Sequence, residues 1–278
     1  MFSICTTAYG DYPDLISRTL NSIKGHFHGH IKDVRIGLNS VSDASLKCVL
    51  DWAGFFRYCP VYIYQEVNNV NVGKYPLMRR MFREEPSPLN ESKFIMWLDD
   101  DSYFDGVTDD WWNRVYALLG KHTVVGLTHY IVSRGNQYIG ITEQPWYTGE
   151  QLQRRHKFKF ATGAWWCAHS ELLDKWDYPF IDVYHNGGDS ILGELCRQQS
   201  ASIVDFKEGA QCHARCCYKG VNRRNVVHVN VGGREGRRGI GKKKAEEVYP
   251  WSLHGSEQPI SYNHNFDLKV YKFDAIQK

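Results

Sequence analysis

The sequence predicts an α/β fold in which a mostly parallel sheet is flanked by helices. Two observations carry this prediction. Short apolar, β-prone runs alternate along the chain with amphipathic helical patterns, and parallel strands need such crossovers between them. The 278 residues are 42% apolar and 23% charged, which suits a compact globular domain and excludes collagen, low-complexity disorder and a small disulfide-stapled scaffold.

The first strand and helix show the pattern most clearly. Residues 2–6 are apolar and β-prone, and Leu15, Ile16, Leu20 and Ile23 then fall on one helical face. The same alternation continues to about residue 206 and returns in the tail. Strands are expected at 34–38, 61–64, 94–98, 124–127, 160–168, 202–206 and 266–273, and helices at 43–52, 73–82 and 190–196.

The expected environment of the chain follows from its hydropathy and its cysteines. No run of about 18 uncharged apolar residues and no basic-then-apolar leader occurs, so we expect neither a membrane span nor a secretory signal. The eight cysteines are mostly scattered. A chain of this length builds a core without bridges, so we expect free thiols and a cytoplasmic protein.

Positive charge is concentrated in one segment. Residues 213–244 carry ten Lys and Arg against one acid, Glu235, which is a formal charge of +9 in a chain whose total is +3. The segment also contains six glycines. We therefore expect a mobile basic loop with an anionic partner rather than a packed element.

Polar residues gather where three expected strands end, at 6–9, 39–40 and 99–101. In open parallel sheets, ligands bind beyond the carboxyl ends of the strands. The sequence therefore predicts a ligand site at this edge before any chemistry is considered.

Asp99, Asp100 and Asp101 are the strongest chemical signal. Three adjacent carboxylates at the end of a buried strand repel one another, and a divalent cation relieves that repulsion. Carboxylate oxygens suit Mg²⁺ or Mn²⁺, which often complete their shells with substrate phosphates. The alternative is a solvated acidic turn that leads to Asp105.

Five short segments stand in a characteristic order: 2–9 (FSICTTAY), 71–73 (NVG), 94–101 (FIMWLDDD), 161–166 (ATGAWW) and 187–189 (GGD). In this order they resemble glycosyltransferases of the GT-A fold, and most of all the large inverting family 2, typified by cellulose and chitin synthase-like enzymes. The DxD element at 99–101 and the Gly-Gly-Asp element are the most specific. The resemblance covers about residues 2–206.

The resemblance implies a Rossmann-like GT-A catalytic domain over residues 1–206, with a nucleotide-sugar half at 1–101 and an acceptor half at 102–206. Residues 207–278 would form the basic loop and a tail packed on the same domain. The implied reaction moves a hexosyl or pentosyl group from a nucleotide-sugar, expected to be a UDP-sugar, to an acceptor hydroxyl with inversion. The implied cofactor is Mn²⁺ or Mg²⁺, a Lewis acid for the leaving diphosphate.

Several residues are implied to hold the donor and its metal. Asp99 and Asp101 would ligate the metal, and Asp99 and Asp100 would also contact the donor. Asn39 stands where the family commonly has an Asp that recognises the base or ribose, and because an amide also donates, bases other than uracil stay open. The other implied donor-binding residues are Thr6, Ala8 and Tyr9 along the nucleoside, Gly73 and Lys74 at the Asn-x-Gly turn, and Arg224 in the basic segment.

Arg79 and Arg80 follow in the same expected helix and could meet phosphate or sugar. Because they are adjacent, they cannot both point at a ligand. A solvated helix face is the preferred interpretation for either one.

Asp189 is the implied catalytic base, which would take the proton from the acceptor hydroxyl during attack. The structural alternative is that Asp189 caps the helix that follows, and the two roles are compatible. The family usually has a second acid near the base, whereas here Ser190 follows and Glu194 lies one turn beyond. Retention of anomeric configuration therefore stays open.

The acceptor subsite is implied by residues of two segments. Gly163, Trp165 and Trp166 lie where the family has the floor of this subsite, and Gly188 would leave room for the acceptor beside the base. Indole faces stack on sugars and on nucleobases. Adjacent strand residues face opposite sides, so at least one tryptophan is expected in the core, with Trp165 favoured for the site.

A His after the base is a third metal ligand in many GT-A enzymes. Here His213 is chosen over His228 because it follows the last expected strand of the domain more closely. Together with Cys212, Cys216 and Cys217, His213 also suggests a structural zinc site, although the spacing is too cramped for the usual paired knuckles.

The basic segment carries more positive charge than a diphosphate requires. Some viral transferases glycosylate hydroxymethylated pyrimidines in DNA, and such a base is our hypothesis for the acceptor, with DNA bound through its phosphates. Glycan and protein acceptors are the alternatives. Two other classes stay open: a nucleotidyltransferase, and a non-catalytic nucleic-acid-binding protein built on residues 213–244.

Overall fold

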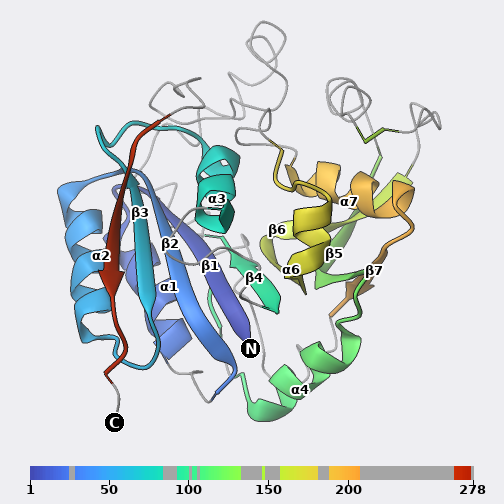
Figure 1. Ribbon diagram of the computed structural model, residues 1–278, viewed down its shortest axis with the longest axis horizontal. Coiled ribbons are helices and arrows are strands. Elements are labelled where there is room, and N and C mark those ends of the chain that lie inside the picture. Colours follow the sequence, from blue (N-terminus) through green and yellow to red (C-terminus); the bar gives the residue numbers. More distant parts are fainter. Residues whose placement is uncertain are drawn as a thin grey trace, which may run out of the picture.

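The computed structural model is built on one eight-stranded sheet with helices on both faces (Figure 1). The structure describes residues 1–24, 29–83, 93–99, 102–104, 107–132, 146–147, 157–180, 188–206 and 266–276. Several residues implied above lie outside these ranges, namely Asp100, Asp101, Gly187, Arg224, His213, His228, Cys212, Cys216 and Cys217, as does the whole basic segment 213–244.

Every strand and helix expected from the sequence is present, with ends that differ by a few residues. The strands are β1 (Phe2–Gly10), β2 (Ile31–Val41), β3 (Val61–Glu66), β4 (Phe94–Leu98), β5 (Thr123–Val132), β6 (Lys157–His169), β7 (Ser202–Asp205) and β8 (Leu268–Phe273). The helices are α1 (Pro13–Lys24), α2 (Asp43–Phe55), α3 (Lys74–Arg83), α4 (Asp109–Leu118), α6 (Ser170–Lys175) and α7 (Gly188–Gln198). Helices α4 and α6 were not expected from the sequence.

The strands run in the order β7-β5-β6-β4-β1-β2-β3-β8. The central strands β4, β1, β2 and β3 pair in parallel, and so do β5 and β7. Strand β6 is antiparallel to both β4 and β5, and β8 is antiparallel to β3. The predicted fold class, a mostly parallel sheet flanked by helices, is confirmed. The end of the chain contributes β8 to this same sheet.

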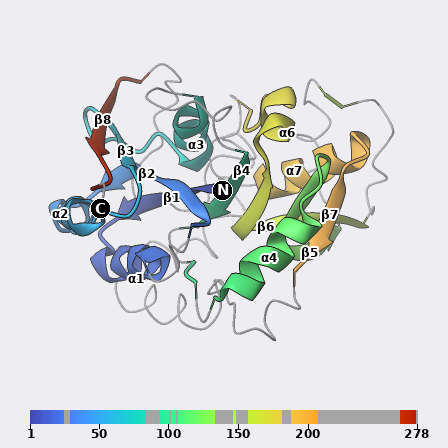
Figure 2. The same ribbon diagram turned by 60° about the horizontal axis from the view of Figure 1, so that its bottom comes forward.

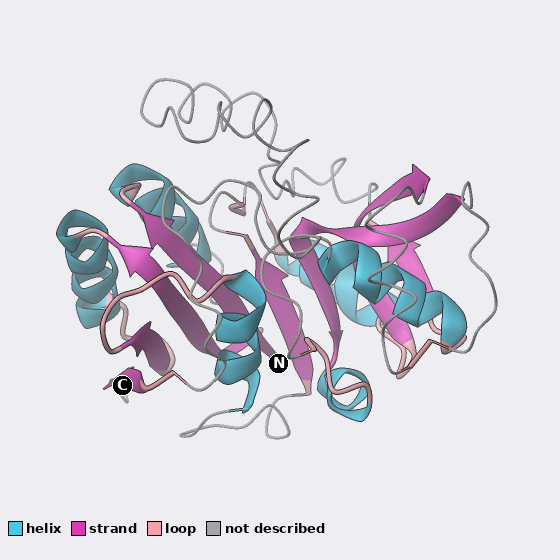
Figure 3. Cartoon of the chain, turned by 90° about the horizontal axis from the view of Figure 1, so that it is seen from above, coloured by secondary structure: helices cyan, strands magenta, loops and turns pink. Residues whose placement is uncertain are grey.

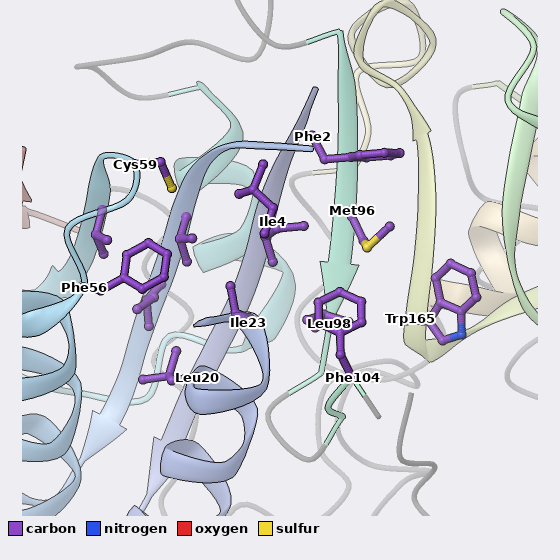
Figure 4. Packing of buried hydrophobic residues seen from close by; sticks show 14 of the residues in the cluster. Phe2, Ile4, Leu20, Ile23, Phe56, Cys59, Met96, Leu98, Phe104 and Trp165 are labelled. Atoms are coloured by element: carbon purple, nitrogen blue, oxygen red, sulfur yellow. The ribbon is translucent and has the colours of Figure 1, made fainter. Parts of the chain in front are cut away.

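Two hydrophobic clusters fill the two faces of the sheet. One cluster joins the sheet to α1, α2 and α4, and Figure 4 shows Ile23 of α1 close to Ile4 of β1 within it. The other joins the sheet to α3, α6 and α7 through residues such as Leu77 and Leu192. Figures 2 and 3 show helices on both sides of the strands. We call the side with α3, α6 and α7 the α3 face.

Side-chain hydroxyls mark where two of the helices begin. The Oγ of Ser42 accepts a hydrogen bond from the Ser45 backbone N–H at 3.1 Å, before α2. The Oγ1 of Thr108 accepts one from the Trp111 N–H at 3.4 Å, before α4. Each cap satisfies one of the backbone donors that a helix start leaves without an intrahelical partner.

Helix α3 is tied to the sheet by a buried cation. The Arg35 guanidinium is fully buried and pairs with Asp33, with Nε 3.1 Å from Oδ1. Its Nη1 donates to the Met81 carbonyl oxygen at 2.9 Å. A buried charge that is both paired and hydrogen-bonded keeps its geometry, because breaking either contact leaves it desolvated. The last turn of α3 is therefore fixed against β2.

The described cysteines are free thiols, as expected: Cys5, Cys48, Cys59, Cys167 and Cys196. Burial raises the pKa of the Cys5 thiol to about 12, so it stays protonated. Among the helices that the structure describes, none combines the length and apolar character needed to cross a bilayer.

Candidate active site

The polar strand ends meet on one edge of the sheet. In the parallel ladders Tyr9 of β1 is opposite Asn39 of β2, and Thr6 is opposite Leu98, the last residue of β4. Asp99, the next residue after Leu98, therefore leaves β4 beside the last few residues of β1. The expectation that these residues share one edge holds for all of them that are described.

Asn39 holds the segment that leads into α3. Its Nδ2 donates to the Asn71 Oδ1 at 2.9 Å, and its Oδ1 accepts from the Val72 backbone N–H at 2.9 Å. The Asn71 Oδ1 also accepts from the Gly73 N–H at 3.0 Å. Both asparagines are buried. Recognition of a base by Asn39 stays a prediction, and its amide is already engaged by this turn.

Gly73 gives the chain its direction into α3. Its φ is +88°, in the left-handed region that favours glycine. Upstream, the Glu66 carboxylate accepts from the Val70 N–H at 2.9 Å and from the Asn68 side chain at 3.1 Å. The loop between β3 and α3 is thus fixed at both ends, and Lys74, the first residue of α3, has a set position.

Lys74 and Asp99 form a buried ion pair at this edge. The Lys74 Nζ lies 2.5 Å from the Asp99 Oδ1, and the two side chains are only 12% and 6% exposed. The ammonium also lies 5.2 Å from the centre of the Trp97 ring, within the range of cation–π attraction. Lys74 therefore supplies the local positive charge beside the first carboxylate of the acidic triplet.

Asp189 lies in the first turn of α7, one residue inside the helix. Its Oδ1 accepts a hydrogen bond from the Ser190 N–H at 3.1 Å. A carboxylate in the first turn is favoured by the helix dipole. The structural alternative considered from the sequence is thus partly present, because the carboxylate does satisfy a donor at the start of the helix.

The Glu194 carboxylate is already engaged, so it does not supply a free second acid near Asp189. It is fully buried, and both its carboxylate oxygens accept from the Arg197 Nε, at 3.0 and 2.9 Å. Its Oε1 also accepts from the Gln198 side chain at 2.8 Å. The carboxylate is engaged within α7 itself.

Tyr75 and Tyr178 are the site residues that sequence reasoning missed. The Tyr75 hydroxyl hydrogen-bonds the Tyr178 side chain and the Asp189 backbone, and it lies within electrostatic reach of Asp99. Burial raises the pKa of both phenols well above their usual value, and the nearby Asp189 carboxylate raises both further. Both phenols are therefore neutral. A tyrosine next to Lys74 gives no sequence signal for a contact with residue 189.

Of the β1 residues implied to bind the donor, Thr6 and Ala8 are buried. Thr6 and Ala8 are 2% and 1% exposed, and Ala8 belongs to the cluster beneath α1 and α2. Because these side chains are buried, only the backbone at these positions is left to line a nucleoside. Tyr9, which the side-chain alternation puts on the α3 face, is half-buried.

Trp165 and Trp166 face opposite sides of β6, as expected, but both lie in the core. Trp165 is 5% exposed and packs against Trp111 and Phe206, with ring centres 5.7 and 6.0 Å apart. Trp166 is 1% exposed and packs edge-on against Tyr178 at 6.0 Å. The expectation that an indole is open to an acceptor is corrected. Trp111 of α4 covers the Trp165 ring, and Tyr178 covers the Trp166 ring on the α3 face. Gly163 lies within β6, two residues before Trp165, in the stretch where the register between β5 and β6 shifts.

Arg79 and Arg80 bind the protein itself. The Arg79 Nη1 donates to the backbone oxygens of Asp177 and Pro179 at 3.0 and 2.8 Å. The Arg80 Nη1 donates to the Phe266 backbone oxygen at 2.8 Å. They tie α3 to the segment before α7 and to the segment before β8.

The chemistry of the acidic triplet fits a hard divalent cation. Asp99, Asp100 and Asp101 carry three carboxylates. Lys74 balances the charge of one of them. The two remaining negative charges match the charge of one divalent cation. Asp99 is the member of the triplet that the structure describes. In the described ranges, no three His, Cys, Asp or Glu side chains form a ready-made metal cluster.

Comparison with known proteins gives similarity in structure alone. No protein-family model matches the chain, and no curated protein does. A mannosyltransferase, PcManGT from Pyrobaculum calidifontis, solved in complex with GDP-Man and Mn²⁺, matches with a TM-score of 0.51 and 14% identity, over 73% of this chain and 54% of that chain. This chain thus spans about half of the mannosyltransferase, whose fold it shares.

Weaker likenesses are found to TarS from S. aureus. One TarS structure gives a TM-score of 0.46 and 13% identity, over 82% of this chain and 38% of that one. A structure of TarS residues 1–349 gives a TM-score of 0.45 and 12% identity, over 74% of this chain and 58% of that one.

Proposed function

We propose that the chain is a metal-dependent glycosyltransferase that takes a sugar from a nucleotide-sugar. The observation that carries the proposal is the buried Lys74–Asp99 pair at the carboxyl end of β4, beside the start of α3. This is the place where open parallel sheets bind ligands. The fold shared with a mannosyltransferase holding GDP-Man and Mn²⁺ supports the same assignment.

Asp99 and Asp101 would hold the cation, and Asp100 would contact the donor. When bound, Mn²⁺ or Mg²⁺ supplies Lewis-acid stabilisation of the diphosphate leaving group. Lys74 would bind the diphosphate, because its ammonium already lies at this corner and the positive end of α3 starts at the same residue. Arg224 and His213 are proposed from the sequence as further contacts to the phosphates and the metal.

Tyr9 would lie along the nucleoside, with Asn39 holding the turn behind it. A UDP-sugar is the proposed donor by resemblance. GDP-sugars belong in the same assay, since the similar mannosyltransferase was solved with GDP-Man.

Asp189 would act as the base. It lies in the first turn of α7 and shares Tyr75 as a neighbour with Asp99, so donor and base would face one another across this edge. A carboxylate there can accept the proton of the acceptor hydroxyl as it attacks the anomeric carbon. The acceptor would lie near Gly188 and Gly163, and inversion is the proposed stereochemistry.

The acceptor class is proposed from sequence charge. The +9 segment 213–244 favours a polyanion, and hydroxymethylated pyrimidines in DNA combine a hydroxyl with a phosphate backbone. Transfer to hydroxymethylated duplex DNA that falls steeply with salt supports this acceptor. Transfer to a neutral glycan or protein, with negligible DNA association at modest salt, contradicts it.

The assay for the donor reaction measures release of nucleoside diphosphate from a panel of UDP- and GDP-sugars with Mn²⁺ or Mg²⁺. Asp101→Ala, Asp99→Asn and chelation should each abolish release, and Asp189→Asn should lower transfer by about 10²–10⁴-fold. Asp51→Asn is the control, because that carboxylate is 54% exposed in α2. Release that survives both chelation and Asp101→Ala, or pyrophosphate released from a nucleoside triphosphate instead, would refute the proposal.

A further inference from the structure

Two buried phenols lie between the donor corner and the start of α7. Tyr75 follows Lys74 in the first turn of α3 and is 3% exposed, and Tyr178 lies after α6 and is 1% exposed. The two residues come from segments far apart in the sequence. They meet at the Gly188–Asp189 peptide, which opens α7.

The phenols form a short chain of hydrogen bonds around that one peptide group. The Asp189 N–H donates to the Tyr75 oxygen, and the Tyr75 and Tyr178 hydroxyls bond one another. The Tyr178 hydroxyl donates to the Gly188 carbonyl oxygen at 3.4 Å. Since the Tyr178 hydrogen is used there, the Tyr75 hydroxyl is the donor between the two phenols. Both polar atoms of the peptide are thus bound by neutral tyrosines.

Gly188 lets the Tyr75 ring reach this position. A Cβ at residue 188 would lie 2.1, 2.4 and 2.5 Å from three atoms of the ring. These distances are too short for any side chain to fit there. The ring therefore lies directly against the backbone of α7. The absence of a side chain, and not only room for a ligand, accounts for glycine at this position.

The Tyr178 ring is itself held in place. Trp166 packs edge-on against it at 6.0 Å between ring centres, and Phe180 packs edge-on at the same distance. Its backbone N–H donates to the Leu173 carbonyl at the end of α6. Neither phenol can turn away without disturbing packed neighbours.

We propose that Tyr75, acting with Tyr178, is a positioning residue that fixes the Gly188–Asp189 peptide and so sets where the Asp189 carboxylate stands relative to the Lys74–Asp99 pair. The inference rests on the proposed function, in which Asp189 is the base and Lys74 and Asp99 hold the donor. Because Tyr75 adjoins Lys74 in the same helical turn, one rigid residue links both sides of the reaction. A base displaced by about 1 Å costs on the order of 10²-fold in rate.

The test removes one hydroxyl at a time. Tyr75→Phe and Tyr178→Phe keep both rings and their packing, so the fold is retained. Tyr64→Phe is the matched control: Tyr64 is a fully buried tyrosine in the same cluster, and within the described residues its hydroxyl has no hydrogen-bond partner. Steady-state kinetics with a nucleotide-sugar and an acceptor, and urea unfolding, are measured for these three variants and for the Tyr75→Phe/Tyr178→Phe double variant.

Tyr75→Phe and Tyr178→Phe are expected to lower kcat by about 10–100-fold while the donor KM changes less than about twofold, because the donor corner is intact and only the base is displaced. The double variant should be about as slow as either single variant, because both hydroxyls act on one peptide. Tyr64→Phe should keep wild-type kcat.

A purely structural role for the phenols predicts a different result. In that case Tyr75→Phe would shift the urea midpoint yet keep kcat within about twofold of Tyr64→Phe, and the positioning inference would be wrong while the proposed function stood. If the wild-type protein releases no nucleoside diphosphate from any donor, the proposed function fails first, and that outcome is separate from the comparison of variants. Normal kcat with a raised donor KM in Tyr75→Phe would also overturn the inference.

Discussion

At the scale of single residues, Lys74 is held by two kinds of contact where α3 begins. Its ammonium is held between the Asp99 carboxylate and the Trp97 ring, largely out of water. Charges taken from water need their partners, because a desolvated carboxylate left alone is costly. The same pair on a solvated helix surface contributes little, because water screens it.

This contrast gives a prediction for two lysines. Lys74→Met, which keeps the apolar stem, should lower the free energy of unfolding by about 3 kcal/mol or more, because it leaves Asp99 buried without its cation. Lys47→Met removes one partner of the exposed Lys47–Asp51 pair and should change it by less than about 0.5 kcal/mol. Urea unfolding at neutral pH measures both. Equal effects would mean that the Lys74–Asp99 pair is solvated in solution.

Residue identity predicted where the candidate residues lie in the fold, but it did not predict what they contact. Asp99 follows a strand and Asp189 lies in the first turn of a helix, and both positions can be recognised in the sequence. The contacts of Asn39 are not, because an amide beside a strand end is equally suited to a ligand and to a turn. The structure assigns its side chain to Asn71 and Val72, partners that only the packing of α3 on β2 brings near.

At the scale of elements, the start of α7 depends on what packs against it. A helical glycine normally costs stability relative to alanine, by about 1 kcal/mol. At Gly188 the Tyr75 ring reverses that expectation, because a Cβ would overlap it. Whether a Gly188→Ala substitution raises or lowers the stability therefore reports whether the Tyr75 ring and α7 are in contact.

Gly188→Ala is expected to destabilise the protein by about 1–3 kcal/mol through overpacking. Gly54→Ala is its counterpart in α2, where nothing lies within 4 Å of an added Cβ, and it should stabilise by about 0.5–1 kcal/mol. Chemical unfolding of the two variants gives both signs. A stabilising Gly188→Ala would show that Tyr75 does not rest on α7.

The junction of β6 and α6 should make stability depend on pH. Burial lowers the pKa of His169, which packs against Phe94; Lys93 and Lys121 lower it further, and Glu171 opposes them. The unfolded chain then binds a proton more readily than the folded one. The stability that comes from keeping His169 neutral is complete above the ordinary His pKa of about 6.5, and it is lost as the pH falls below that value.

His169→Phe should remove this component while keeping a ring against Phe94. Wild-type stability is expected to fall between pH 7 and 5 more steeply than that of the variant, by at most about 1.4 kcal/mol per pH unit, the limit for one proton. Unfolding curves at several pH values provide the slopes. Identical slopes would show that His169 titrates normally.

Helices differ in how well their patterns predict them. Helix α1 shows its apolar face in the spacing of Leu15, Ile16, Leu20 and Ile23. Helix α4 also carries a signal, since Thr108 is a good cap and two acids follow it. Its paired tryptophans hide the period, because both are buried: Trp112 packs against Phe104, and Trp111 packs against Trp165. The same packing explains why Trp165 is not open to an acceptor.

At the scale of the whole molecule, one sheet joins strands from the first to the last described segments of the chain. Strand β4 pairs with β1 in parallel and with β6 antiparallel, so the strand that leads to Asp99 and the strand that bears Gly163 are neighbours in one continuous ladder. On the α3 face, Tyr75 and Gly188 repeat that connection through side-chain packing. The site is therefore held together twice, by backbone and by core.

The far edge of the sheet is closed by the last described strand. β8 pairs antiparallel with β3 from Glu66–Leu268 to Val61–Phe273, and the Tyr271 hydroxyl donates to the Gln65 Oε1 at 3.1 Å. Alternation of polar and apolar residues in the tail predicted a strand, but not its partner, because pairing over such a sequence distance leaves no local trace.

Removal of residues 268–278 should expose the hydrogen-bonding edge of β3. An exposed, apolar edge strand pairs with other chains, so the shortened protein is expected to self-associate more than the full chain at equal concentration, as measured by light scattering after size-exclusion chromatography. Tyr271→Phe, which loses one hydrogen bond and keeps β8, should behave like the full chain. If the shortened protein shows an unchanged association state and unchanged stability, β8 does not protect this edge. Because Phe266 and its contact with Arg80 are retained, α3 keeps its anchor, and any loss of donor turnover can be traced to β3 itself.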